Sequence, residues 1–364
     1  MPLITRLPRT LRSLALSLPV LMHSILPAQG QDKALVEAAR KEGKVTIFGS
    51  LQEEVMKAIL ESFDRKYPGV KSVYWRASTT AVMDRAINEF RTGKVSWDIF
   101  FTGVDAMEIM RAEGMFLKYQ TPASKNFDKE YHHAFYSPNY RSSLIGFVYN
   151  TRYIKPAEAP KSYWDYADPR WDGKTTMSDP TAHTSMAKWL SSLHLVLGDK
   201  SKEDEYAQRL AASAPLLHRS LTPAVESIAN GERPLGIAYI KYVCDMGKVG
   251  APLDYVRLPA YLGEGNYIAI GSKSANVNAA KLWIDHWYSK ESMTALANDC
   301  EFVNLRGVHP PLKDAGKIKF VEEIQRSETD YKQLGEKYGK FFKNSMPHQA
   351  QRGSFIGVRV PTLE

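Results

Sequence analysis

The sequence lacks the short motifs that mark the commonest catalytic sites. It contains no G-x-x-x-x-G-K-[ST] phosphate loop, no G-x-G-x-x-G after a strand, no G-x-S-x-G and no H-E-x-x-H. Cysteine is scarce as well, with two residues in 364, which excludes a small disulfide-rich scaffold. The sequence therefore shows none of the motifs that would most clearly indicate an enzyme. We expect neither a metal site nor a cofactor.

Long apolar runs are missing beyond the N-terminus. Residues 1–30 hold no Asp, Glu or Lys, carry Arg6, Arg9 and Arg12, and continue into an apolar stretch at 14–26. This stretch is shorter than the roughly 20 residues needed to span a bilayer. We predict a cleavable signal peptide at residues 1–30 and an exported protein; the alternative is an uncleaved anchor.

The sequence has only a small excess of basic over acidic residues. The chain has 48 basic and 40 acidic residues, giving a formal charge of +8, and three of the basic residues lie in the first 30 positions. Acids and bases alternate along the rest of the chain, as on an ordinary solvated surface. We expect no nucleic-acid partner.

Strand-like and helix-like segments alternate through a chain that is 44% hydrophobic and 24% charged. Apolar runs at 45–48 and 97–101 predict buried strands, and residues 55–67 show helical spacing. A second unit begins near Leu144, with an apolar helix expected at 185–197. This pattern predicts an α/β fold with a parallel sheet, which binds ligands where its strands end.

A hydroxyl-rich turn precedes the apolar helix of the second unit. It runs from Ser178 to Ser185 and includes Thr181 and Thr184. Free N–H groups at a helix start attract anions, so this turn is a candidate anion site; helix capping alone is the alternative.

The two cysteines, Cys244 and Cys300, are expected to be buried thiols. An exported chain can hold a disulfide, but spacing in one sequence does not bring two Cα atoms within bridging distance.

Four collinear blocks resemble the periplasmic solute-binding proteins of ABC importers, in the group that includes ferric-iron binders. They are Lys41–Phe48 with Phe63–Val70, Tyr163–Lys174 with Ser178–Thr181, Pro234–Tyr239, and Leu262–Tyr267 with Ala279–Trp283.

The resemblance implies the type II periplasmic binding fold, with two lobes, a central cleft and two hinge crossings. Lobe 1 would comprise residues 31–142 and 267–364, and lobe 2 residues 143–266. The polar C-terminal stretch would lie over lobe 1. The two cysteines would then fall in different lobes, where a bond restricts closure unless it lies beside the hinge.

The resemblance also implies a periplasmic monomer that delivers a small-molecule solute to a membrane permease. The iron-binding members carry an adjacent tyrosine pair where this chain has Tyr239-Ile240-Lys241-Tyr242. A lysine suits Fe³⁺ poorly, so a small anionic organic solute is favoured and ferric iron is the alternative. The predicted ligand contacts are Ser50, Arg76, Ser78, Thr102, Thr181, Thr184, Ser185, Tyr239, Lys241 and Tyr242.

Two other classes stay open from the sequence. An exported enzyme on the same scaffold would use Asp179 and His183 as its nearest acid/base pair. A binding protein that serves a sensor cannot be separated from a transporter component by sequence.

Overall fold

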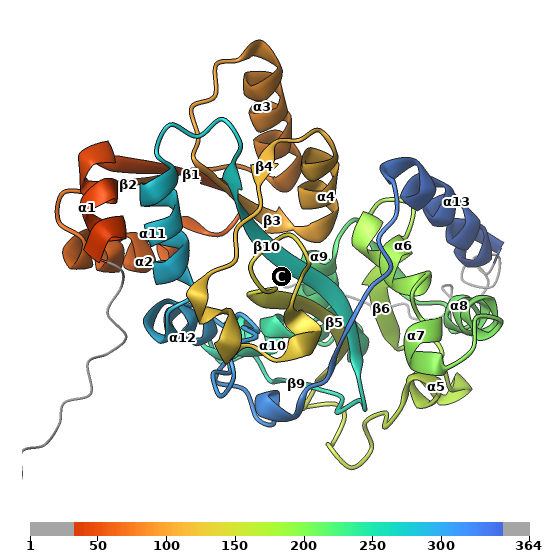
Figure 1. Cartoon of the computed structure of the whole chain (residues 1–364). Coiled ribbons are helices and arrows are strands. Elements are labelled where there is room, and N and C mark those ends of the chain that lie inside the picture. The colour runs from red at the N-terminus through yellow and green to blue at the C-terminus, as the bar shows by residue number, and fades with distance from the viewer. Residues whose placement is uncertain (1–32, 345–364) are drawn as a thin grey trace, which may run out of the picture.

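A single mixed sheet organises the chain (Figure 1). The structure is a computed structural model that describes residues 33–344, so the expected signal peptide lies outside the described residues. The strands are β1 (Lys44–Gly49), β2 (Lys71–Arg76), β3 (Ile99–Gly103), β4 (Phe116–Leu117), β5 (Arg141–Asn150), β6 (Thr175–Ser178), β7 (Leu216–His218), β8 (Leu235–Tyr239), β9 (Leu253–Tyr255), β10 (Tyr261–Gly271) and β11 (Phe320–Glu322).

The order of the strands is β2-β1-β3-β10-β5-β8-β6-β7, with β4 and β11 also paired to β10 and β9 paired to β5. The outer strands are parallel, as predicted: β1 with β2 and β3, and β6 with β7 and β8. The centre is antiparallel, which the prediction of a parallel sheet missed. The reason is that the chain leaves the first half of the sheet along β5 and returns beside it along β10.

Helices cover the sheet and confirm the predicted α/β class. They are α1 (Lys33–Glu42), α2 (Glu53–Lys66), α3 (Thr79–Thr92), α4 (Val104–Ala112), α5 (Tyr163–Tyr166), α6 (Thr184–Leu190), α7 (His194–Leu197), α8 (Lys202–Ala212), α9 (Leu221–Asn230), α10 (Lys241–Gly247), α11 (Val277–Trp287), α12 (Lys290–Asn298) and α13 (Glu328–Asn344). α1 packs on α11 (Figure 1) and α2 on β2, whereas α9 packs on β8 in the other half of the sheet.

The hydrophobic core is split between the two halves of the sheet. Two clusters surround β1, β3 and the carboxyl-terminal part of β10, and include the fully buried Trp97 and Trp283. A third cluster surrounds β5, β6 and β8 and includes the fully buried Trp189. We call these the first and second halves; their correspondence to the predicted lobes stays a prediction.

The second half departs from the prediction in its helices. The helix expected at 185–197 is interrupted between α6 and α7, where the Ser191 hydroxyl donates to the Lys188 carbonyl (3.0 Å) and that of Ser192 accepts from the Ile324 N–H (3.0 Å). The C-terminal stretch was expected over the first lobe. It instead forms β11 on β10, and α13 packs on α6 and α8, because the apolar face of α13 enters the third cluster (Figure 1).

Cys244 and Cys300 form a disulfide, so the expectation of two separate thiols is wrong. Cys244 lies on α10, and Cys300 follows α12. The segment after Cys300 runs along the start of β5, where the Ser142 N–H donates to the Phe302 carbonyl (2.9 Å). α10 also packs on β5, so both cysteines lie beside this strand with their Cα atoms 5.7 Å apart, which sequence spacing alone does not reveal.

Candidate functional site

The strand ends of the two halves face each other along β10. Gly103, at the carboxyl end of β3, pairs with Asn266. Tyr239, at the carboxyl end of β8, pairs with Ile145 of β5, which in turn pairs with Leu262. The two carboxyl ends therefore converge on residues 262–266, which is where sheets of this kind bind ligands.

The first half contributes hydroxyl groups and one free cation. Ser50 Oγ and Thr102 Oγ1 lie 3.3 Å apart, and the Thr102 hydroxyl donates to Thr79 (3.4 Å). Ser78 caps α3 by accepting from the Ala81 N–H (3.3 Å). Arg76 is exposed at the end of β2 and makes no hydrogen bond or ion pair with any residue in 33–344. The structure thus brings Ser50 and Thr102 together and gives Ser78 a structural role.

The second half contributes two tyrosines. The Tyr239 hydroxyl donates to Ser185 Oγ (3.2 Å), and the Tyr242 hydroxyl shares a 2.9 Å hydrogen bond with Thr222. The two phenol rings are 5.9 Å apart. Burial raises the pKa of Tyr239, so its hydroxyl is neutral at pH 7.

The hydroxyl-rich turn lies beside these tyrosines, and Asp179 shapes it. The Thr181 N–H and hydroxyl both donate to Asp179 Oδ1, at 2.8 and 2.7 Å. The His183 ring contacts Ser178 (3.2 Å), and burial lowers the pKa of His183. The Asp179 carboxylate is thus engaged by Thr181.

Lys241 already has a partner. Its Nζ is 2.9 Å from Glu301 Oε1, and the other carboxylate oxygen is 2.5 Å from Arg141 Nη1. Glu301 is buried, so these two cations neutralise it away from water. Lys241 therefore braces α10 against the segment after α12, and its charge is not free in the way the anion hypothesis assumed.

A buried lysine that the sequence analysis missed joins the two halves. Lys188 of α6 is 3% exposed, and its Nζ lies 2.8 Å from Asp105 Oδ2 of α4 and 3.6 Å from Glu264 Oε1 of β10. Burial alone lowers the pKa of Lys188, but Glu264 and Asp105 outweigh burial and raise it. The lysine stays charged as a result. The sequence signal was one lysine inside the apolar run Met186–Leu190.

Two further carboxyl groups, those of Glu322 and Glu323, interact electrostatically with Lys188. Burial raises the pKa of Glu323 to about 8, and also raises that of Glu264. Glu323 is 3% exposed, and its Oε1 makes no hydrogen bond within the described part of the chain. Asp105, Glu264 and Glu322 add to the negative charge around it, while Lys188 opposes it.

We expect Glu323→Gln to become more stable relative to the natural chain as the pH rises. The pKa of this carboxyl in the folded protein exceeds its ordinary value of 4.5. The contribution of Glu323 to the free energy of unfolding is therefore complete below pH 4.5 and is lost as the pH rises through about 8. Urea unfolding at pH 5 and pH 8 should show a relative gain on the order of 2 kcal/mol for the variant. Glu226→Gln, at an exposed position of α9, is the control and should show no such trend. A parallel trend in both variants would contradict the assignment.

Membrane-spanning helices and metal-binding clusters are both absent from the described residues. Among residues 33–344, no helix combines the length and apolar character needed to cross a bilayer. Within the same range, no three His, Cys, Asp or Glu side chains are grouped so as to hold a metal ion.

Comparisons with known proteins identify the family. Residues 58–326 match the family described as bacterial extracellular solute-binding protein. An uncharacterized protein of Haemophilus influenzae is 26% identical over 280 residues, covering 71% of this chain and 76% of its own. This chain belongs to the bacterial extracellular solute-binding proteins.

Solved structures give the fold. The periplasmic binding protein AfuA from Actinobacillus pleuropneumoniae, with fructose-6-phosphate bound, superposes with a TM-score of 0.61 at 18% identity, covering 84% of this chain and 98% of AfuA. Iron-bound HitA from Pseudomonas aeruginosa gives 0.63 at 16% identity, covering 83% and 99%. The fold is therefore that of the type II periplasmic binding proteins. Two further structures with this fold are the substrate binding protein of an ABC transporter from Agrobacterium tumefaciens and an ABC transporter from Clostridium perfringens, at 15% and 17% identity.

Proposed function

We propose that this chain captures a small anionic organic solute between the two halves of the sheet and delivers it to an inner-membrane permease. The convergence of the β3 and β8 ends on residues 262–266 carries this proposal. The family supports the transport role. The predicted signal peptide supports a periplasmic location, and we propose that the protein acts there as a monomer and catalyses no reaction.

The side chains at the strand ends suit a solute with hydroxyl groups and a negative charge. Ser50, Thr102 and Tyr239 offer hydroxyl groups, and the unpaired Arg76 offers a planar guanidinium. Guanidinium groups bind carboxylates and phosphates through two parallel hydrogen bonds. With Lys241 held by Glu301, Arg76 carries most of the proposed recognition of the anion.

Ferric iron is the second candidate, because Tyr239 and Tyr242 lie side by side and two phenolates are ligands that Fe³⁺ accepts. Iron-bound HitA and an iron- and citrate-bound protein from Trichodesmium share the fold. Against iron, both hydroxyls are engaged with Ser185 and Thr222, and the nearby Glu301 carboxylate is already paired with Lys241.

Thermal unfolding against a ligand panel tests the proposal. The panel holds ferric citrate, phosphonates, sugar phosphates, carboxylates, amines and neutral sugars. A ligand at a hundredfold excess over its Kd adds about 2.7 kcal/mol to the free energy of unfolding, which raises the unfolding temperature measurably. We expect the organic anions to stabilise the chain. A visible absorption band with iron alone would favour the tyrosine pair instead.

Arg76→Ala should weaken the affinity for the stabilising anion at least tenfold, because a hydrogen bond to a charged group contributes about 1.5–3 kcal/mol. Titration calorimetry measures the change. Arg152→Ala is the matched control, since Arg152 is exposed after β5, at the edge of the sheet opposite Tyr239. Equal affinities in the two variants would sink the anion assignment.

A further inference from the structure

The Asp105 carboxylate of the first half is engaged from two sides by the second half. Asp105 lies in the first turn of α4, whose apolar residues pack in the core of the first half. The Nζ atom of Lys188, on α6, is 2.8 Å from its Oδ2 atom, and the Tyr331 hydroxyl, on α13, is 3.4 Å from its Oδ1 atom. Both carboxylate oxygens therefore contact the other half of the molecule.

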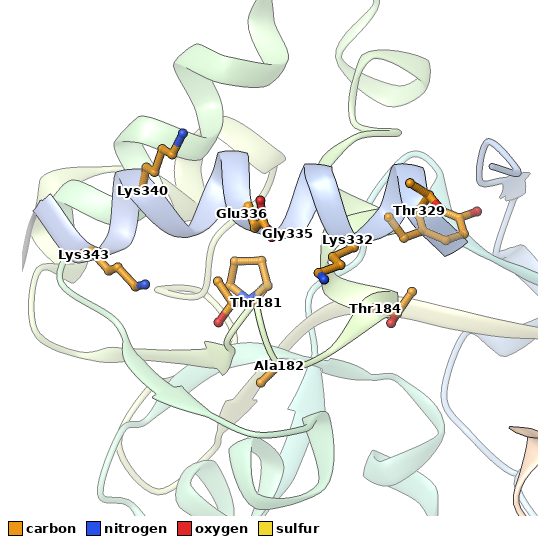
Figure 2. Close-up of a pocket in the computed structure, with 11 residues that line it drawn as sticks. Thr181, Ala182, Thr184, Thr329, Lys332, Gly335, Glu336, Lys340 and Lys343 are labelled. Atoms are coloured by element: carbon orange, nitrogen blue, oxygen red, sulfur yellow. The ribbon is translucent and has the colours of Figure 1, made fainter. Parts of the chain in front are cut away.

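The helices α6 and α13 belong to one unit, the second half. Trp189 of α6 is fully buried in the third cluster, and the apolar face of α13 packs against the same cluster. Figure 2 shows α13 lying across the turn that precedes α6. A Cβ atom at Gly335 would be 2.6 Å from the Pro180 carbonyl oxygen, a distance that only glycine permits. Because the two helices are seated so closely, we expect them to move together.

The segment before α13 fixes Tyr331 to the end of α6. The Arg326 guanidinium donates to the Ser191 hydroxyl (2.9 Å), and the Arg326 backbone N–H donates to the Tyr331 hydroxyl (2.9 Å). Lys188 and Tyr331 thus form one surface of the second half that receives Asp105.

Attraction to carboxylates outweighs the burial of Lys188. The lysine side chain is 3% exposed, whereas those of Asp105 and Glu264 are 24% and 29% exposed. Burial lowers the pKa of Lys188, but Glu264 and Asp105 together raise it by more, so its charged form is stabilised at this position. Glu264 belongs to β10, which crosses between the halves. Of these two partners, only Asp105 lies on a helix of the first half.

A covalent link also joins the halves, beside β5. The disulfide ties Cys244 of α10 to Cys300 after α12, whereas Lys188 and Asp105 meet beside β10. A hinge motion that parts α4 from α6 keeps this bond and breaks the contacts of Asp105, which are noncovalent.

We propose that Lys188 and Asp105 form a latch that holds the two halves together before a solute binds. Lys188 is then a positioning residue for binding, because it acts through closure of the halves and needs no contact with the solute. The apparent affinity for a ligand that binds the closed form falls in proportion to the closed fraction. The latch does not depend on which solute is bound, whereas its effect on affinity rests on the proposed function.

Distances between spin labels on the two halves test the latch. The labels are attached through Asn88→Cys and Gln208→Cys, at exposed positions of α3 and α8, in the full chain without added ligand. The native cysteines are bonded to each other and take no label. α3 packs on α4 and α8 on α13, so the labels separate when α4 parts from α6. We expect one short distance while the latch is intact, and a shift to longer distances in Lys188→Met, which loses the ammonium group but keeps an unbranched side chain.

Two further variants complete the test. Asp105→Asn should shift the distance in the same direction, because it removes the charge and keeps the shape of the side chain. Lys337→Gln is the matched control, since it breaks an ion pair with Asp204 (2.5 Å) that joins α13 to α8 within the second half, and it should leave the distance unchanged. In the ligand panel described above, a fall of the closed fraction to about one tenth should weaken binding by Lys188→Met about tenfold.

Equal distances in the labelled chain with the latch and in Lys188→Met would overturn the proposal, and so would an equal shift in Lys337→Gln. A shift in distance with unchanged affinity would overturn the positioning role. If Lys188→Met lacks a cooperative urea transition, it has not folded, and Asp105→Asn decides the outcome. The distances are measured without a solute, so a wrong solute class does not affect them. A failed latch leaves the expected effect of Arg76→Ala on anion binding in place, so the two proposals fail independently.

Discussion

Replacing Glu301 with glutamine is expected to lower the free energy of unfolding by about 3–5 kcal/mol, the usual cost of breaking a buried ion pair. Glu301 is 3% exposed and forms ion pairs with both Arg141 and Lys241. Without its charge, Arg141 keeps only the 3.1 Å hydrogen bond to Asn266 Oδ1, and its Nε already lacks a partner in the described range. Urea unfolding measures the loss.

The matched control is Glu61→Gln. Glu61 lies 4.0 Å from Arg65 on the exposed face of α2, where an ion pair contributes about 0–1 kcal/mol. Burial alone raises the pKa of Glu301, but Arg141 and Lys241 hold it below its usual value. The difference in the free energy of unfolding between Glu301→Gln and Glu61→Gln should therefore be present at neutral pH and shrink as the pH falls below 4.5. A loss in Glu301→Gln no larger than in the control would show that the pair is not buried in solution.

Removing the disulfide with Cys244→Ala/Cys300→Ala is expected to cost about 4 kcal/mol. The bond closes a loop across a sequence separation of 56, and cross-linking a loop of this length restricts the unfolded chain. Unfolding in urea with and without a thiol reductant gives the measurement. The reductant should destabilise the natural chain and leave the double variant unchanged.

Reductant sensitivity separates this prediction from a packing effect. Both cysteines are buried, so replacing them also removes some contacts. If the natural chain were equally stable in the two conditions, the bond would contribute nothing, and any loss in the double variant would come from packing alone.

The sequence predicted the outer parts of the sheet well because local patterns decide them. The apolar runs at 45–48 and 97–101 lie in β1 and overlap β3, and the helical spacing at 55–67 coincides with α2. The resemblance added the type II fold, which the solved structures confirm. The antiparallel centre escaped prediction, since the pairing of β10 with β3 and β5 depends on residues more than 100 positions apart.

The candidate site was predictable only in part. Ser50 directly follows β1, and Thr102 lies near the end of β3. The two hydroxyl groups meet because these strands are neighbours, and the apolar runs in the sequence predict both strand ends. Lys241 was expected to be free, but its partner Glu301 is 60 residues away. Lys188 was hidden for the same reason, as Asp105 and Glu264 come from distant segments. Whether the ten predicted residues contact a solute stays a prediction.

The position of β10 also governs when the sheet can be completed during synthesis. β1, β2 and β3 emerge early, but one edge of β3 waits for β10, which is made more than 150 residues later. Until then β3 exposes unpaired backbone groups beside apolar side chains, a state prone to wrong pairing and slow folding. A fragment that ends before Tyr261 would therefore lack a finished first half, and the nascent chain stays incompletely folded until the last third has been made.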